Sequence, residues 1–136
     1  MIVTFTPVEG DSRAYDFKPQ KLMSVESETV ERLTGKPYLE AVQAVVQGSA
    51  LARRALVYVL EKRAHPTLSW ASFDFPFDAV EVEFDRDELA TMREAVATAP
   101  GLSDAERDQA TTALAAMEEA APVVPKAPEP SDVTAT

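Results

Sequence analysis

Cysteine is absent from this chain of 136 residues, which also has only one histidine and four glycines. Without cysteine the chain has no disulfide, no thiolate nucleophile and no Cys-based zinc site. A single histidine provides no His-rich metal cluster and disfavours Ser-His-Asp chemistry. Four glycines exclude a phosphate-binding loop of the P-loop or dinucleotide type. The composition therefore predicts a non-enzymatic domain with no catalytic, metal-binding or cofactor-binding residues.

Long hydrophobic runs are also missing. No stretch of 18 apolar residues occurs, so we expect no transmembrane helix. The first ten residues, MIVTFTPVEG, lack a basic start followed by an apolar stretch, so we expect no signal peptide. The sequence predicts a soluble intracellular protein that does not bind membranes.

Basic residues are few, and the charge is uneven. Thirteen Lys and Arg stand against 23 Asp and Glu, for a net charge of −10. Residues 1–66 hold nine basic and eight acidic side chains (net +1), whereas residues 67–136 hold four and fifteen (net −11). The acidic half would repel a phosphate backbone, so we expect no nucleic-acid partner. Two roles stay open for it, namely solubility and an acidic interaction region.

Alternation of apolar and polar residues predicts three strands. Val3 and Phe5 alternate with threonines, residues 9–12 have turn chemistry, and residues 14–17 return, which together predict an N-terminal β-hairpin. Residues 80–84 alternate in the same way and predict a further strand.

Cap residues and apolar periodicity predict the helices. They span residues 25–34, 37–48, 50–63, 86–98 and 104–121. We expect N-caps at Ser24 and Ser49, capping boxes at Asp85/Glu88 and Ser103/Glu106, and stops at Gly35 and Gly48.

These elements predict an α+β fold in which an N-terminal β-hairpin and a further strand pack with four to five helices. We divide the chain into an α+β core domain (1–98), an Ala-rich C-terminal helix (99–121) and a Pro-rich tail (122–136). The helix has few large apolar residues and contributes little packing of its own. The tail has four prolines in fifteen residues, so we expect it to be disordered.

Aromatic residues concentrate in the segment 67–78, TLSWASFDFPFD. Residues 73–77 alternate and allow a strand, which Pro76 confines to an edge or a turn. Two roles are open: rings packed in the core, or an exposed ledge for an apolar partner. We favour the core, because the chain has few other large side chains.

Three groups of polar residues are candidates for catalysis or ligand binding. His65 stands at a helix end, where a charged imidazole favours the helix dipole. The acidic residues between 81 and 88 lack the ligand spacing of a calcium loop. The basic residues of the third helix are spaced as a solvated face rather than a phosphate site; they are Arg53, Arg54, Lys62 and Arg63.

Three features stand out over about residues 1–90: a hairpin ending in a Tyr-x-Phe strand, an acidic helix ending in Thr-Gly, and a helix followed by Arg-Ala-x-Pro-Thr-Leu. The residues that form them are Tyr15 and Phe17; Glu28, Glu31, Thr34 and Gly35; and Ala55, Leu56, Val57, Arg63, Ala64, Pro66, Thr67 and Leu68. In these features and their order the chain resembles the tail assembly chaperones of long-tailed, siphovirus-like phages and prophages of actinobacteria.

The resemblance implies a function. Such chaperones bind the tape measure protein, keep it soluble in the host cytoplasm, help to recruit tail tube protein, and are depleted in the mature virion. The family often makes a longer product by programmed frameshifting, and Val124-Pro125-Lys126 allows the slippery codons GTC-CCA-AAG. The alternative is a small virion structural protein, such as a tail-completion, connector or decoration subunit.

The partner-binding surface is predicted at apolar positions of the second and third helices that the hairpin leaves uncovered. The candidates are Val42, Val46, Leu56 and Leu60. All four positions are equally suited to the core.

Overall fold

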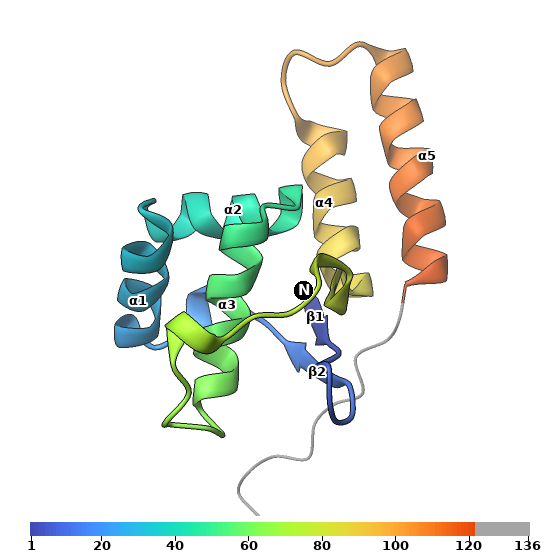
Figure 1. Cartoon of the computed structure of the whole chain (residues 1–136). Coiled ribbons are helices and arrows are strands. Elements are labelled where there is room, and N and C mark those ends of the chain that lie inside the picture. The colour runs from blue at the N-terminus through green and yellow to red at the C-terminus, as the bar shows by residue number, and fades with distance from the viewer. Residues whose placement is uncertain (122–136) are drawn as a thin grey trace, which may run out of the picture. The chain divides into compact units, whose positions relative to one another are not determined.

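The computed structural model describes residues 1–121, and the tail predicted to be disordered, 122–136, lies outside the described residues. The chain divides into two compact units, Met1–Glu83 and the segment from Phe84 onward. The described residues form a three-stranded antiparallel sheet and five α-helices, which confirms the predicted α+β class (Figure 1). The sequence-based division at residue 98 differs, because it separates two helices that pack together.

The sheet is built around its first strand. β1 (Ile2–Phe5) lies between β2 (Arg13–Asp16) and β3 (Val80–Glu83), antiparallel to both. The hairpin and the further strand are therefore confirmed. Alternate residues of β1 point to one face, and on that face Val3 and Phe5 are almost completely buried.

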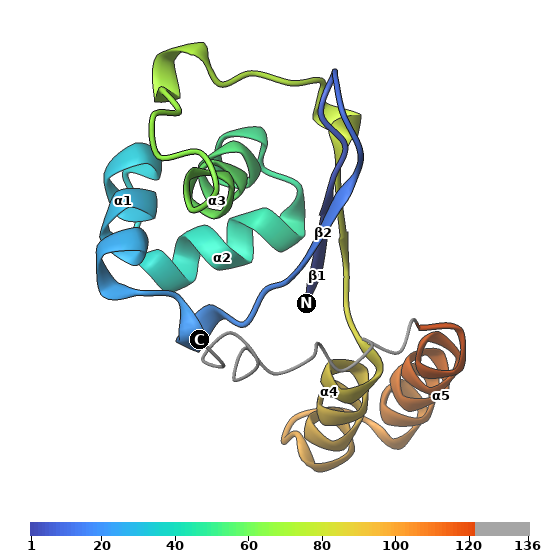
Figure 2. The ribbon, with the colours of Figure 1, turned by 90° about the horizontal axis from the view of Figure 1, so that it is seen from below.

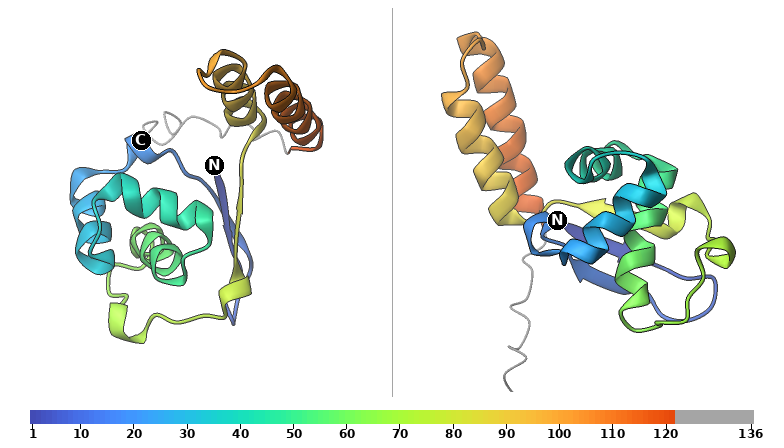
Figure 3. Two further views of the ribbon diagram at one scale, coloured as in Figure 1. Left: turned by 90° about the horizontal axis from the view of Figure 1, so that it is seen from above. Right: turned by 90° about the vertical axis from the view of Figure 1, so that its left-hand side faces the viewer.

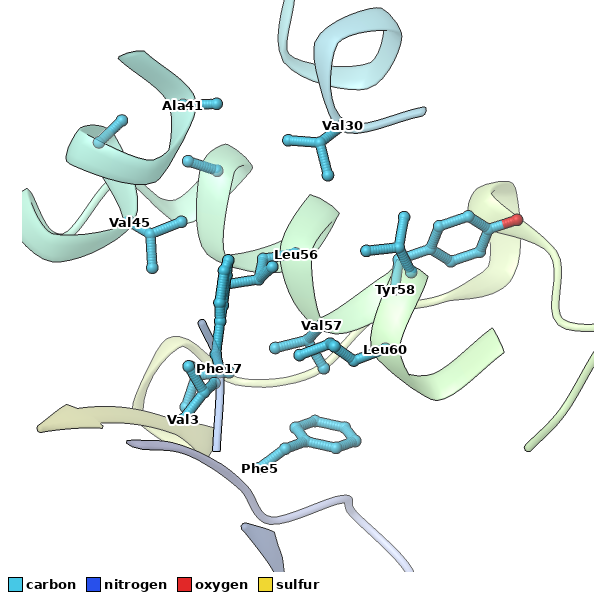
Figure 4. Packing of buried hydrophobic residues seen from close by; sticks show 14 of the residues in the cluster. Val3, Phe5, Phe17, Val30, Ala41, Val45, Leu56, Val57, Tyr58 and Leu60 are labelled. Atoms are coloured by element: carbon cyan, nitrogen blue, oxygen red, sulfur yellow. The ribbon is translucent and has the colours of Figure 1, made fainter. Parts of the chain in front are cut away.

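Three helices lie on one side of this sheet (Figure 2): α1 (Ser24–Thr34), α2 (Tyr38–Gln47) and α3 (Ala50–Lys62). The third is the most buried, because its apolar residues occupy almost every position of its second half. Side chains of α3, among them Leu56 and Leu60, pack with Val3, Phe5 and Phe17 in the core (Figure 4). Burial of such a cluster is the main stabilising term of the first unit.

Most helices begin and end at the capping residues that the sequence predicts. Ser49 caps α3 by accepting a hydrogen bond of 3.2 Å from the Ala52 amide. Gly35 and Gly48 end α1 and α2 with φ of 69° and 91°, which only glycine adopts without strain. The N-cap predicted at Ser24 is wrong. That residue is already helical, because Glu26 reaches back to the Met23 amide at 3.2 Å and starts the helix one residue earlier.

The aromatic segment connects α3 to β3 without forming a strand. It contains two 3-10 turns, Trp70–Ser72 and Phe77–Ala79, so the strand allowed at 73–77 is absent from the structure. The rings of Phe73 and Phe75 lie 5.9 and 5.0 Å from that of Phe5, centre to centre. The core role favoured for this segment is confirmed for Phe73, which is buried; Trp70 and Phe75 are half-buried against the core, and Phe77 is 55% exposed.

The described part of the second unit is a pair of neighbouring helices, α4 (Arg86–Thr98) and α5 (Asp104–Ala120), drawn in gold and orange in Figure 3. Both predicted capping boxes are present: Asp85 accepts from the Glu88 amide at 2.8 Å, and Ser103 from the Glu106 amide at 3.1 Å. No residue of α5 is buried, in agreement with its small side chains. The two helices are joined by an ion pair of 2.7 Å between Arg93 and Glu118.

Candidate binding groove

A groove with a volume of about 490 Å³ lies between α1 and α3, and we refer to it as the α1–α3 groove. Its apolar surface comes from both helices and from the turn that holds Trp70. Leu33 and Trp70 are half-buried, and Val59 is buried. At the rim, Val25 is 73% exposed. A volume between about 300 and 1,000 Å³ is typical of ligand-binding clefts.

One wall of the groove is an aromatic pair. The rings of Tyr58 and Trp70 meet edge to face, with centres 5.3 Å apart. Such pairs contribute about 0.5–1.5 kcal/mol beyond the area that they bury. The Tyr58 hydroxyl donates to the Leu68 carbonyl at 3.1 Å and accepts from Nζ of Lys62 at 3.0 Å. The wall is thus fixed on both its apolar and its polar side.

Arg54 holds the turn that carries this wall. Its guanidinium lies 3.8 Å from the centre of the Trp70 ring, in cation–π contact. The same group donates to the carbonyls of Trp70 and Phe73, both at 2.5 Å. One side chain therefore anchors a segment that has no strand or α-helix of its own.

Charge in the groove is predominantly positive. Three basic side chains and one acidic side chain line it. Glu26 accepts two hydrogen bonds from Arg63, at 2.7 and 2.8 Å. These bonds are the largest cause that lowers the pKa of Glu26, and they raise the pKa of Arg63. Within residues 1–121, the other two cations, Arg32 and Lys62, form no ion pair with a carboxylate.

Two of the four basic residues predicted to form a solvated face, Lys62 and Arg63, are exposed, whereas Arg53 and Arg54 are half-buried. Arg53 donates to the Val45 carbonyl at 2.9 Å and lies 5.4 Å from the centre of the Phe77 ring. Arg63, at the end of the helix, binds Glu26. Spacing alone did not reveal these contacts, because their acceptors lie on other segments of the chain.

A buried carboxylate sets the position of α3 over the sheet. Glu61 is only 2% exposed, and it accepts from Nε of Arg13 at 3.0 and 3.1 Å and from the Tyr15 hydroxyl at 2.8 Å. Burial and, secondly, this hydrogen bond raise the pKa of Tyr15 to about 12. This cluster was not predicted from the sequence. The only local signal was that Arg13 and Tyr15 share one face of β2.

The four residues predicted to bind a partner lie outside the groove. Leu56 and Leu60 are buried in the core, which was the other role that the sequence left open. Val42 is half-buried against the core, and Val46 is 39% exposed. The groove residues Val25, Arg32 and Lys62 were not singled out, because their proximity depends on how α1 and α3 pack.

Comparison with known proteins gave no match to any family model, to any curated protein or to any solved structure. Among residues 1–121, no three His, Cys, Asp or Glu side chains are grouped so as to hold a metal ion. None of the helices described by the structure has the length and apolar character needed to cross a membrane.

Proposed function

We propose that this chain is a phage tail assembly chaperone that binds the tape measure protein, keeps it soluble and helps to recruit tail tube subunits. The observation that carries the proposal is the α1–α3 groove, with its apolar wall and exposed rim. The resemblance of residues 1–90 to such chaperones supports it independently. The proposed role makes and breaks no covalent bond, and it is carried out in the host cytoplasm.

The dimensions of the groove fit this role. A groove of about 490 Å³ takes only a short apolar stretch of a partner. Many copies along one long partner then give strong overall binding from weak, reversible contacts. The net charge of −10 keeps the complex soluble, because like-charged complexes repel one another.

Co-expression with the neighbouring tape measure protein tests the proposal. We expect the tape measure protein to be found in the soluble fraction with this chain and in the pellet without it. Val25→Asp places a charge at the groove rim and should abolish the effect. Val8→Asp is the matched control, because Val8 is 78% exposed and lies outside the groove. A tape measure protein that is equally soluble without the chain contradicts the proposal.

Mass spectrometry of purified particles distinguishes the alternative. A chaperone is depleted in mature virions, whereas a tail-completion, connector or decoration subunit is present in fixed stoichiometry. Stoichiometric presence of this chain would therefore favour the structural role over the proposed one.

A further inference from the structure

We propose that the α1–α3 groove binds an amphipathic helix whose apolar stripe is flanked by acidic residues. The inference rests on the proposed function only for the source of the helix, which would be a segment of the tape measure protein. The binding chemistry itself comes from the residues that line the groove.

Charge complementarity determines the sign of the charge that the partner must carry. The chain has a net charge of −10, yet its groove is lined by three basic side chains and one acidic one. The single acid, Glu26, is already neutralised by Arg63. Arg32 and Lys62 make no ion pair with a carboxylate in residues 1–121, and both are exposed at the surface. Carboxylates on a partner would complete both contacts.

The elements around the groove favour a helical partner over an extended one. All lining residues come from α1, from α3 with the residue that follows it, and from the turn at Trp70. One common binding mode of an extended peptide is addition to a sheet edge, and no strand residue lines this groove. A helix instead places apolar side chains at i, i+3, i+4 and i+7 into a groove between two other helices.

The groove is organised before a partner binds. Trp70 is stacked by Arg54, hydrogen-bonded through its carbonyl, and packed edge to face on Tyr58. A fixed wall loses little conformational entropy on binding, so a short helix can bind measurably. After Trp70, Val25 is the second apolar residue that a partner helix would contact. It is 73% exposed and would become buried on binding.

Trp70 is the only tryptophan in the chain, so its fluorescence reports on the groove directly. The probe is a synthetic peptide of about 18 residues, five helical turns, without tryptophan. It carries leucines at i, i+3, i+4 and i+7, with glutamates on both flanks. A second peptide has lysines in place of the glutamates, and a third has the glutamate composition in scrambled order.

We expect the glutamate peptide to change the Trp70 emission with saturation, and the lysine and scrambled peptides to bind at least about tenfold more weakly. Raising the salt concentration should weaken the binding of the glutamate peptide, because salt screens exposed charges. Equal binding of the glutamate and lysine peptides, or no emission change with any peptide, overturns the inference.

Two charge reversals test the contacts. Arg32→Glu and Lys62→Glu should each lower the affinity for the glutamate peptide by about threefold to tenfold. Lys36→Glu is the control: Lys36 is exposed and outside the groove, so it should leave binding unchanged. Equal effects of all three reversals would indicate general electrostatics and refute the inference.

The same variants separate this inference from the proposed function. If the double variant Arg32→Glu/Lys62→Glu still solubilises the tape measure protein as wild type does, the charged groove is not the site, although the chaperone function stands. If wild type binds the glutamate peptide but never solubilises the tape measure protein, the chaperone function fails and the groove chemistry stands.

Discussion

The hydroxyl of Tyr15 donates a hydrogen bond of 2.8 Å to Oε2 of Glu61, and this bond joins β2 to the last turn of α3. Arg13, two residues away on the same strand, donates to the same carboxylate. A carboxylate that is 2% exposed is tolerated only when its oxygens are paired, because burial disfavours an unpaired charge. The cluster thus fixes α3, and with it one side of the α1–α3 groove.

Glu61→Gln should lower the free energy of unfolding by about 1–3 kcal/mol, because the amide cannot accept all the donors that face the carboxylate. Urea unfolding followed by Trp70 fluorescence measures the change. Glu9→Gln, at an exposed position of the hairpin turn, should differ from wild type by less than about 0.5 kcal/mol. Equal stability of the two variants would show that the buried cluster is not a stabilising contact.

Stability should fall at high pH because of Tyr15. Its pKa is raised from 10.0 to about 12 in the folded chain, so the folded state keeps the phenolic proton where the unfolded state loses it. Its contribution is therefore complete below pH 10 and is lost as the pH rises to about 12. Urea unfolding at a series of pH values should show this decline, and Tyr15→Phe should make it shallower.

Tyr38 provides the comparison for that measurement. Burial raises its pKa to about 12 as well, and its hydroxyl donates to the Pro19 carbonyl at 2.8 Å. Tyr38→Phe should remove its own part of the decline, and the double variant should be flatter than either single one. A decline that is unchanged in the double variant would contradict the assignment to these two tyrosines.

Glu26 should affect stability at the other end of the pH range, because its contribution is lost at low pH. Hydrogen bonds from Arg63 are the main cause that lowers the pKa of Glu26. Its contribution to stability is present above the ordinary glutamate pKa and is lost as the pH falls through the lowered value. An NMR titration of the Glu26 carboxyl should give a pKa below that of an exposed glutamate. In Arg63→Met the pKa should rise, and an unchanged pKa would exclude the ion pair as its cause.

Arg54→Lys should loosen the wall of the groove. Lysine has one compact charge and cannot stack on Trp70 while donating to two carbonyls. We expect a red shift of the Trp70 emission, a lower fluorescence anisotropy and a loss of about 1–2 kcal/mol in the free energy of unfolding. Lys36→Arg, a conservative change at an exposed site, should leave all three unchanged. Emission identical to wild type would contradict the anchoring role of Arg54.

Local signals predicted most elements of the fold. Ser49, Asp85 and Ser103 cap their helices as expected, since a cap involves residues within three positions of one another. The alternation in β1 and β3 is equally local. The N-cap at Ser24 failed because the side chain of Glu26 starts the helix one residue earlier.

The candidate site was not predictable, because its contacts join distant segments. In the sequence, Glu61 is only one polar residue of an amphipathic helix. Its partner Arg13 lies 48 positions earlier, so only the folded structure shows that the two are in contact. Arg54 was likewise predicted to be solvated, because the carbonyls of Trp70 and Phe73 that it binds belong to a later segment of the chain. The four predicted partner-binding residues had the right hydrophobicity, but hydrophobicity alone does not distinguish a core position from a surface one.

The order of the strands has a consequence during synthesis on the ribosome. β1 can pair with β2 once the hairpin has been synthesised, but its other edge pairs with β3, which is translated only after all three helices of the first unit. Until then the nascent chain presents an open strand edge, which is a template for mispairing with another chain. Closing it requires a contact of long sequence separation, which slows folding. Shielding of the newly made hairpin by the ribosome surface or by cellular folding factors would thus raise the fraction of this protein that reaches its native state.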